Sequence, residues 1–350
     1  MTLGVPRETY MKRCLDLAVL GLGHTSPNPL VGSVIVHNDR IIGEGFHHVY
    51  GGPHAEVNAV DAVADKSLLP GSTLYVNLEP CSHSGKTPPC ADMIIRAGIP
   101  EVVIGTSDPN PLVSGNGIRR LEQAGVKVFT GVLQDQCRDL NKRFFTYHTK
   151  KRPLIILKWA QTSDGFMDVL RENAGVQEPN WISNEISRIL VHKWRSEEQS
   201  ILVGTRTALL DNPRLNVRQW SGNSPIRMVL DRNLRLPATL NLFDNSMPTL
   251  VFNALKDSRE GLTQYVRLDF TGSVLRDLLR YLHDKGLQSV FVEGGQKLLN
   301  SFLDENLWDE ARVFTGPVKF GAGISAPVIR HITPAKHRIR EDVVFFYNNQ

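Results

Sequence analysis

Cysteine is scarce in this sequence, where only Cys14, Cys81, Cys90 and Cys137 occur among 350 residues. So few cysteines, with no basic and apolar leader at the start, argue against a disulfide framework and predict a reducing compartment, the cytoplasm. Long apolar runs are also missing, because charged or turn residues interrupt every candidate, so no membrane span is expected. The remaining composition, 41% hydrophobic and 22% charged, is that of a globular protein.

An excess of positive charge is absent from the first half of the chain. Residues 1–150 hold 14 Lys+Arg and 14 Asp+Glu, which leaves 26 against 22 for the rest. A polynucleotide-binding domain usually presents a broad basic surface. The charge balance therefore predicts a partner other than nucleic acid.

The basic, proline-ended stretch Lys150-Lys151-Arg152-Pro153 predicts a boundary between two domains, residues 1–150 and 151–350. Strand-like and helix-like segments alternate on both sides of it, which predicts two layered α/β domains. In the first domain we expect helices at 10–21, 55–64 and 91–97, and strands at 31–36, 41–45, 73–78 and 102–106. In the second we expect strands at 154–160, 201–204, 227–230, 249–252 and 289–293, a helix capped by Ser183 that runs to 195, and helices at 275–282 and 298–303.

The stretch Pro53-His54-Ala55-Glu56, taken with Pro80-Cys81 and Cys90, carries the clearest chemical pattern. One imidazole and two thiolates are a typical ligand set for a catalytic zinc ion that keeps its fourth position for water. His54 and Cys90 each begin a predicted helix, where the helix dipole favours thiolates. Glu56 stands close enough to reach that water without being a ligand, so it is the predicted proton carrier.

Plainer interpretations of the same residues stay open. His54 suits a helix cap, Cys81 and Cys90 suit unrelated buried thiols, and His83 would close the zinc site as a fourth, structural ligand. However, His-x-Glu followed by Pro-Cys and a second cysteine is the signature of zinc deaminases that act on nucleobases. The combination predicts a zinc-dependent deaminase for a pyrimidine-like ring.

Eight residues separate Cys81 from Cys90, which is longer than the two-residue spacing of the nucleic-acid-editing deaminases. The stretch from residue 78 to 90, Leu-Glu-Pro-Cys-Ser-His-Ser-Gly-Lys-Thr-Pro-Pro-Cys, resembles the deaminase domain of the RibD family. Members of this family are bifunctional deaminase/reductases of riboflavin biosynthesis. The segments 25–32, 51–56 and 108–113 share the resemblance, which spans residues 10–145.

The resemblance implies a cytidine-deaminase-like three-layer fold and a particular reaction. That reaction removes an amino group from 2,5-diamino-6-(5-phosphoribosylamino)pyrimidin-4(3H)-one. Amide and carboxylate side chains suit the donors and acceptors of the ring, and lysine and histidine suit its phosphate. The substrate-binding residues that the resemblance implies are Asn28, His47, His83, Lys86, Asp108 and Asn110.

In the second half, Gly294-Gly295 stands between a predicted strand and a predicted helix. Glycines at this point let a backbone approach a phosphate at the helix N-terminus. The full G-x-G-x-x-G fingerprint is missing, however, and a Gly-Gly turn also occurs for structural reasons alone. On these residues by themselves, cofactor binding and a plain turn both remain open.

Segments 158–165, 181–183, 191–195, 201–218 and 292–295 resemble the reductase domain of the same family. That domain is similar to dihydrofolate reductase in fold and uses NADPH to reduce the ribosyl group to a ribityl chain. The implied cofactor-binding residues are Gln161, Trp181, Thr207, Asp211, Gly295, Gln296, Lys297, Leu298, Leu299, Asn300 and Ser301. The implied substrate-binding residues are Lys158, Arg195, Leu215, Arg218 and Glu293, the arginines suiting phosphate and Lys158 the open-chain carbonyl.

Three positions depart from the family pattern. Thr162-Ser163 replaces a common Ser-Leu, Asn212 replaces an aspartate, and Arg232 replaces a small polar residue. Arg232 is open to two interpretations, a contact with the cofactor's 2′-phosphate or a side chain that faces solvent. Cys14 and Cys137 are expected to pack in the interior.

Three functions are thus compared. A nucleic-acid-editing deaminase is opposed by the neutral first half and the long cysteine spacing. A non-catalytic zinc-stabilised protein is opposed by Glu56, which a structural zinc site does not require. We favour a bifunctional enzyme that holds one Zn²⁺ and uses NADPH. It is expected to act on a small phosphorylated pyrimidine, without a nucleic-acid or membrane partner, and to form a homo-oligomer.

Overall fold

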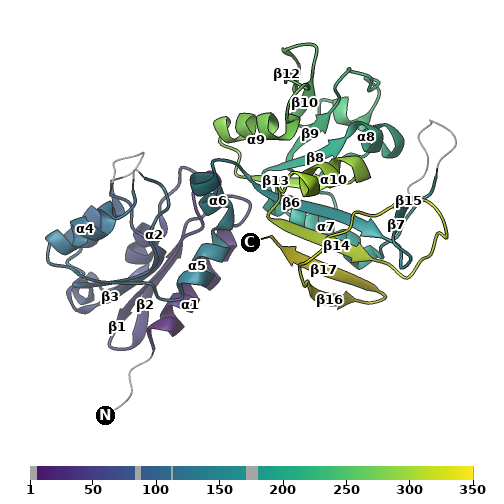
Figure 1. Cartoon of the computed structure of the whole chain (residues 1–350). Coiled ribbons are helices and arrows are strands. Elements are labelled where there is room, and N and C mark those ends of the chain that lie inside the picture. The colour runs from purple at the N-terminus through teal and green to yellow at the C-terminus, as the bar shows by residue number, and fades with distance from the viewer. Residues whose placement is uncertain (1–5, 83–87, 112, 171–179, 350) are drawn as a thin grey trace. The chain divides into compact units, whose positions relative to one another are not determined.

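The computed structural model describes residues 6–82, 88–111, 113–170 and 180–349. The chain forms two compact units, Met1–Lys151 and Arg152–Gln350, and each has its own sheet and its own core (Figure 1). Each unit is therefore described by itself. Within the described ranges, none of the helices has the length and apolar character needed to cross a bilayer.

The first unit contains a five-stranded sheet in the order β2-β1-β3-β4-β5. β1 pairs antiparallel with both β2 and β3, and the β3-β4 and β4-β5 pairs are parallel. Asn38 and Asp39 join β1 to β2 with positive φ angles of 49° and 57°, the conformation that a two-residue hairpin turn requires. The strands are β1 (Gly32–His37), β2 (Arg40–Phe46), β3 (Thr73–Leu78), β4 (Glu101–Thr106) and β5 (Lys127–Thr130).

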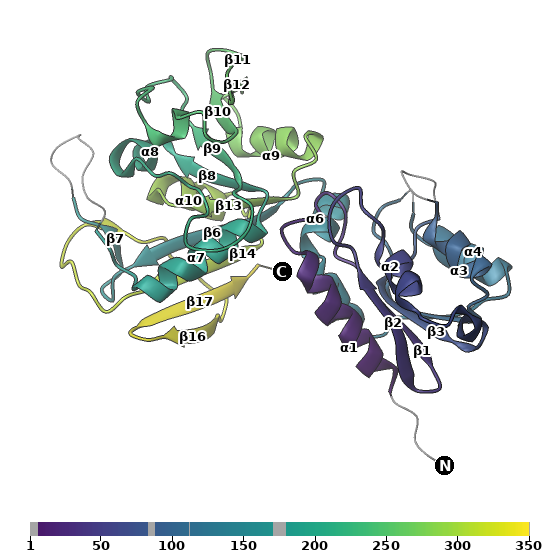
Figure 2. The same cartoon turned by 180° about the vertical axis from the view of Figure 1, so that it is seen from behind.

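Helices cover both faces of this sheet, which gives three layers (Figure 2). Successive residues of β1 serve opposite faces: Ile35 packs with α2, α3 and α4, whereas Val34 and Val36 pack with α1 and α5. Cys14 and Cys137 are fully buried on the second of these faces, as predicted. The helices are α1 (Arg7–Ala18), α2 (Ala55–Ala62), α3 (Cys90–Arg96), α4 (Asn116–Gln123), α5 (Gln134–Leu140) and α6 (Lys142–Lys150).

The second unit contains a ten-stranded sheet in the order β11-β12-β10-β9-β8-β13-β6-β14-β17-β16. Its central strands are parallel from β12 to β14, and β11, β17 and β16 run antiparallel to their neighbours. A separate two-stranded sheet joins β7 (Phe166–Asp168) to β15 (Ile324–Ser325). The main strands are β6 (Leu154–Gln161), β8 (Ser200–Gly204), β9 (Ile226–Leu230), β10 (Thr249–Asn253), β11 (Ser258–Glu260), β12 (Thr263–Arg267), β13 (Ser289–Glu293), β14 (Glu310–Thr315), β16 (Ala335–Ile339) and β17 (Asp342–Asn348).

This sheet also has a core on each face. Ile155 and Leu157 of β6 pack with α9 and α10, and Leu154 and Ile156 pack with α7 and α8. Leucines spaced at a helical period line the buried side of α9, and Ser273 caps its N-terminus by accepting a hydrogen bond from the Arg276 N–H. The helices are α7 (Glu185–Glu197), α8 (Thr205–Asp211), α9 (Val274–Asp284) and α10 (Gln296–Asp304).

One predicted helix start is wrong. Ser183 does not cap α7; the cap is Asn184, whose side-chain oxygen accepts the Ser187 N–H at 3.0 Å. The Ser183 carbonyl instead accepts a hydrogen bond from Arg188. Serine and asparagine are both good N-cap residues, so the residue types did not show which of the two begins the helix.

Candidate active sites

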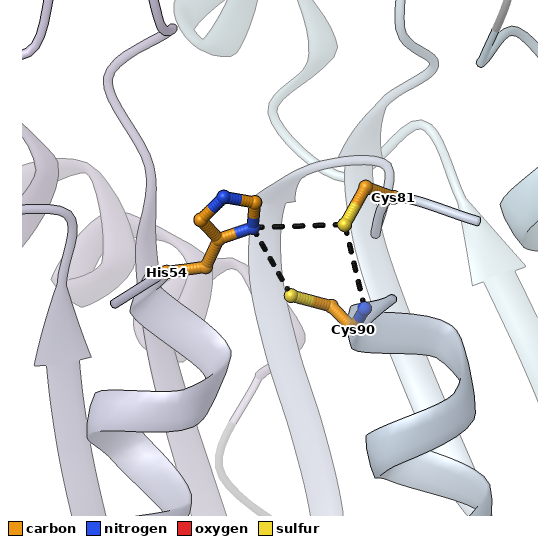
Figure 3. Close-up of side chains that lie close together, drawn as sticks. All are labelled: His54, Cys81 and Cys90. Carbon is orange, nitrogen blue, oxygen red and sulfur yellow. Dashed lines mark hydrogen bonds between the residues drawn. The ribbon is translucent and has the colours of Figure 1, made fainter. Parts of the chain in front are cut away.

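The predicted zinc ligands meet at one point of the first unit (Figure 3). His54 is the N-cap of α2, Cys90 is the first residue of α3, and Cys81 follows β3. Nδ1 of His54 lies 3.3 Å from the Cys90 sulfur and 3.6 Å from the Cys81 sulfur. Ligand atoms about 3.3–3.8 Å apart are what a tetrahedral zinc ion needs at its usual bond lengths. The donor set and its spacing therefore fit zinc.

The environment of Cys81 favours its thiolate. Hydrogen bonds from the Cys90 thiol and backbone N–H, the latter at 3.4 Å, hold the pKa of Cys81 well below its usual range. Cys90 lies at the start of α3, so the N–H that it donates to the Cys81 sulfur is one of those that have no acceptor within the helix. His83, the alternative fourth ligand, lies outside the described residues, as does Lys86.

Glu56 lies in the first turn of α2, two residues after His54, and is only 3% exposed. Burial raises the pKa of this carboxyl to about 7, with a further contribution from Cys81. A carboxyl group with a pKa near neutrality can both accept and release a proton under physiological conditions. Glu56 thus combines a buried position beside the three ligands with a pKa suited to proton transfer.

A cavity of about 360 Å³ opens over these residues. Four of the predicted substrate-binding residues line it: Asn28, His47, Asp108 and Asn110. The Pro53 carbonyl accepts from Nδ1 of His47 at 2.9 Å, which leaves Nε2 to accept the Asn28 amide at 3.0 Å. Burial raises the pKa of Asp108 to about 6. The sequence thus identified much of this cavity.

Other residues of the cavity wall were not among the predicted site residues, including Tyr50, Glu79 and Phe144. Glu79 lies inside the motif at residues 78–90 and Tyr50 directly before the motif at 51–56, so membership of a motif or proximity to one was the available signal. Phe144 comes from α6, far along the chain, and no local pattern marks it.

In the second unit, the predicted substrate-binding residues gather around Glu293 at the end of β13. Arg195 of α7 donates two hydrogen bonds to this carboxylate, at 2.6 and 2.9 Å, and Nζ of Lys158 lies 3.6 Å away. The register of the parallel strands explains the second contact, because Glu293 and Lys158 are direct neighbours on β13 and β6. Burial alone would raise the pKa of Glu293, but the charges of Arg195 and Lys158 bring this pKa to about 2.

Leu215 and Arg218 lie beside this ion-pair cluster. Leu215 is 2% exposed and has a φ of 55°, a left-handed conformation that few non-glycine residues adopt. The next carbonyl, that of Asn216, accepts a hydrogen bond from Arg195 at 3.1 Å. The Arg218 backbone N–H bonds to Nδ1 of His192, whose pKa is lowered to about 4 by burial and by the two arginines.

A second cavity, of about 510 Å³, adjoins the end of β13 and the start of α10. Gly294 and Gly295 have φ angles of 85° and 80°, and a Cβ on Gly295 would lie 3.1 Å from the Thr207 hydroxyl. Because glycine has no side chain, it leaves space in the cavity beside the N-terminus of α10. The predicted cofactor-binding residues that line this cavity are Thr207, Asp211, Gly295, Gln296, Lys297, Leu298 and Ser301.

Four predicted cofactor-binding residues do not line the cavity. Leu299 is fully buried in the core, and Asn300 on the same helix is half-buried. Gln161 accepts a hydrogen bond from the Trp159 indole at 2.9 Å, and Trp181 is 58% exposed with the Arg188 guanidinium 4.6 Å from its ring. α10 turns successive side chains in different directions, so a continuous run of contacts was not to be expected from it.

The structure shows the surroundings of the three departures from the family pattern. Arg232 is exposed, and its guanidinium lies 5.8 Å from the Phe270 ring. Asn212 ends α8 with a φ of 38°, a left-handed conformation that asparagine tolerates well. The Thr162 hydroxyl donates to Asp164, whose carboxylate also accepts backbone N–H groups of Phe320 and Gly321.

Comparison with known proteins defines the class first: a zinc deaminase joined to a reductase. Residues 5–106 match the cytidine and deoxycytidylate deaminase zinc-binding region, and residues 153–340 match the RibD C-terminal domain. The riboflavin biosynthesis protein RibD of Aquifex aeolicus is 41% identical over 326 residues, covering 91% of this chain and 89% of that protein.

Solved structures support the same class of protein. The deaminase/reductase of Thermotoga maritima superposes with a TM-score of 0.88 at 37% identity, covering 98% of both chains. RibD of Acinetobacter baumannii gives 0.86 at 32% identity, covering 98% of this chain and 99% of that one. The chain belongs to the RibD family, the bifunctional deaminase/reductases of riboflavin biosynthesis.

Family membership confirms several predictions made from the sequence. The fold is a cytidine-deaminase-like domain followed by a dihydrofolate-reductase-like domain, as expected. The cofactors are zinc, for which His54, Cys81 and Cys90 provide a compatible triad, and NADPH. The nucleic-acid-editing alternative is not favoured.

Proposed function

We propose that this chain catalyses two consecutive steps on one phosphorylated pyrimidine. In the first unit, water replaces the 2-amino group of 2,5-diamino-6-(5-phosphoribosylamino)pyrimidin-4(3H)-one and ammonia leaves. In the second unit, the ribosyl group of the deaminated product is reduced to a ribityl chain. The observation that carries the proposal is the meeting of His54, Cys81 and Cys90 with a buried Glu56 at the wall of a cavity.

For deamination, His54, Cys81 and Cys90 would hold the zinc ion. When bound, zinc supplies Lewis acidity, which makes a water molecule acidic enough to lose a proton near neutral pH. Glu56 accepts that proton as the oxygen adds to the amino-bearing carbon. It then gives that proton to the ring nitrogen. It next takes the remaining proton of the added oxygen to the amino group, so that the C–N bond breaks, a carbonyl forms and neutral ammonia leaves.

The cavity wall would orient the ring for this step. Asn28 lines the cavity and donates its amide to Nε2 of His47, so this hydrogen bond fixes the orientation of the amide in the wall. Asp108 and Asn110 add a carboxyl and an amide on the same wall. These groups match a ring that presents several N–H donors and carbonyl or nitrogen acceptors.

For reduction, NADPH supplies the two electrons, and the chain positions both reactants. The cavity beside Gly295 would take the cofactor, its phosphates near the N-terminus of α10. Arg195 and Arg218 would bind the substrate phosphate. Loss of solvent around the half-buried Lys158 lowers its pKa, and it would give a proton to the oxygen of the opened sugar.

We further propose that the enzyme is cytoplasmic, forms a homo-oligomer and acts on a free pyrimidine rather than on nucleic acid. The balanced charge of residues 1–150 supports a small-molecule substrate. Light scattering of the purified protein tests the oligomeric state.

The deciding experiment incubates the purified protein with the diaminopyrimidinone, with and without NADPH, and follows ammonia release and NADPH oxidation. We expect ammonia in both cases and NADPH oxidation only after deamination. Supplying the deaminated pyrimidine directly tests the second unit alone. Ammonia without any NADPH oxidation would remove the reductase step from the proposal, and neither signal would refute both steps.

A further inference from the structure

The carboxylate of Glu79 is the most heavily hydrogen-bonded side chain at the wall of the first cavity. It stands directly after β3 and is 4% exposed. One oxygen accepts the backbone N–H groups of Asp108 at 3.2 Å and Gly115 at 3.0 Å. The other accepts those of Gly117 at 3.0 Å and Ile118 at 3.3 Å.

Glu79 thereby caps a helix to which it does not belong. α4 begins after Gly115, whose φ is 72° and which, as a glycine, has no side chain to cap the first N–H groups of the helix. A buried helix start needs such a partner, because its first N–H groups have no acceptor within the helix. The backbone approaches closely to allow this, since a Cβ on Gly117 would lie 2.0 Å from the Pro80 carbonyl oxygen.

The same hydrogen bonds fix the segment that forms one wall of the cavity. The Asp108 carboxylate accepts the Asn110 N–H at 2.7 Å, and the Asn110 carbonyl accepts the N–H groups of Val113 and Ser114, each at 2.9 Å. Asp108, Asn110 and Val113 all line the cavity. Glu79 thus connects this wall to Pro80-Cys81, the segment that carries a zinc ligand.

A direct chemical role for Glu79 is disfavoured by the same geometry. A carboxylate has about four lone-pair positions, and four backbone N–H groups already occupy those of Glu79. Its oxygens are therefore committed to the protein. Glu56, in contrast, is the carboxyl beside the zinc ligands.

We propose that Glu79 is a positioning residue for deamination, which sets the affinity for the pyrimidine by holding Asp108 and Asn110 in place. The proposal rests on the function proposed above for the first unit. Contacts made equally in the ground state and the transition state affect KM rather than kcat, so loss of the wall should appear mainly in KM.

The test is the variant Glu79→Gln, which keeps the shape but turns an NH₂ group toward two backbone N–H donors. We expect the deaminase KM to rise at least about tenfold while kcat changes by less than about threefold. Zinc content and reductase activity on the deaminated pyrimidine should stay at the parent values. The matched control is Glu122→Gln, an exposed glutamate on α4 itself, which should leave both constants unchanged.

An unchanged KM in Glu79→Gln would refute the proposal, and so would loss of zinc, because Glu79 would then support the metal rather than the wall. Amide hydrogen exchange on the unaltered protein covers the case in which the variant does not fold. The N–H groups of Gly115, Gly117 and Ile118 should be protected, and rapid exchange there would overturn the inference. If the unaltered protein releases no ammonia, the proposed function fails, while hydrogen exchange still reports on Glu79.

Discussion

Glu56 combines two properties at the scale of one residue: it is buried against the zinc ligands, and burial brings its pKa to about 7. Glu56→Gln removes the proton carrier and keeps the size of the side chain. We expect zinc content to be retained and the deaminase kcat to fall by about 10²–10⁴-fold, the usual contribution of general acid–base catalysis. Metal analysis and ammonia release measure the two quantities. Substantial turnover in the variant would mean that another residue carries the proton.

Glu293 shows the opposite electrostatic situation, since Arg195 and Lys158 bring the pKa of its carboxyl to about 2 from a usual 4.5. A lowered pKa adds stability that is fully present above pH 4.5 and is lost as the pH falls toward 2. The shift corresponds to stabilisation on the order of 3 kcal/mol. This stabilisation depends on both Arg195 and Lys158, because a buried charge without a partner is costly.

We therefore expect Glu293→Gln to destabilise the second unit at pH 7 by about 3 kcal/mol, with the difference from the parent shrinking below pH 4.5. Calorimetry of both proteins across this pH range measures it. Glu260→Gln is the control, because Glu260 is in an exposed pair with Lys256. A stability difference that stays constant down to pH 2 would contradict the assignment.

At the scale of elements, the position of α2 depends on glycine. A Cβ on Gly45 would lie 2.4 Å from the Ala59 nitrogen, and one on Gly43 would lie 2.3 Å from the Ala59 carbonyl oxygen. The α2 backbone therefore rests directly on β2, which places His54 and Glu56 beside the cysteines.

Gly45→Ala should push α2 away from the sheet. We expect a loss of about 1–3 kcal/mol in unfolding free energy from overpacking, together with weaker zinc binding. Chemical denaturation and metal titration test the two effects. Gly272→Ala, where a Cβ meets open space, should change neither. Full zinc affinity in Gly45→Ala would show that the helix end moves independently of the sheet.

Most of the buried central strands could be predicted because both sheet faces are covered, which makes their sequences nearly continuous apolar runs. β14 was not predicted, because Glu310 and Arg312 interrupt its apolar run. The predicted range 73–78 is β3 itself. α4 was missed because only Gly117 and Leu121 of its residues are buried, and its cap comes from Glu79. The short edge strands β11 and β16 are mostly exposed and carry little apolar signal.

The two sites differ in how much local sequence determines them. The zinc ligands follow from a motif, since His54 and Cys90 lie at helix starts and Cys81 follows β3. The ion pairs of Glu293 instead depend on strand register and on α7, which only the resemblance could supply. The backbone bonds of Glu79 have no side-chain pattern at all, so only the structure reveals them.

At the scale of the whole molecule, two residue types are divided between the units. Cys14, Cys81, Cys90 and Cys137 all precede residue 152, and every tryptophan follows it. Within the described residues, each core cluster also draws on one unit only. Removing zinc should therefore disturb the first unit and leave the second intact.

We expect a chelator to open Cys81, which is half-buried, to a thiol reagent, while Cys14 and Cys137, both fully buried, stay protected. Tryptophan emission should not change, and reductase activity should persist. A simultaneous shift in emission would show that the units unfold together. Thiol titration and intrinsic fluorescence thus report separately on the two halves of the enzyme in a single sample.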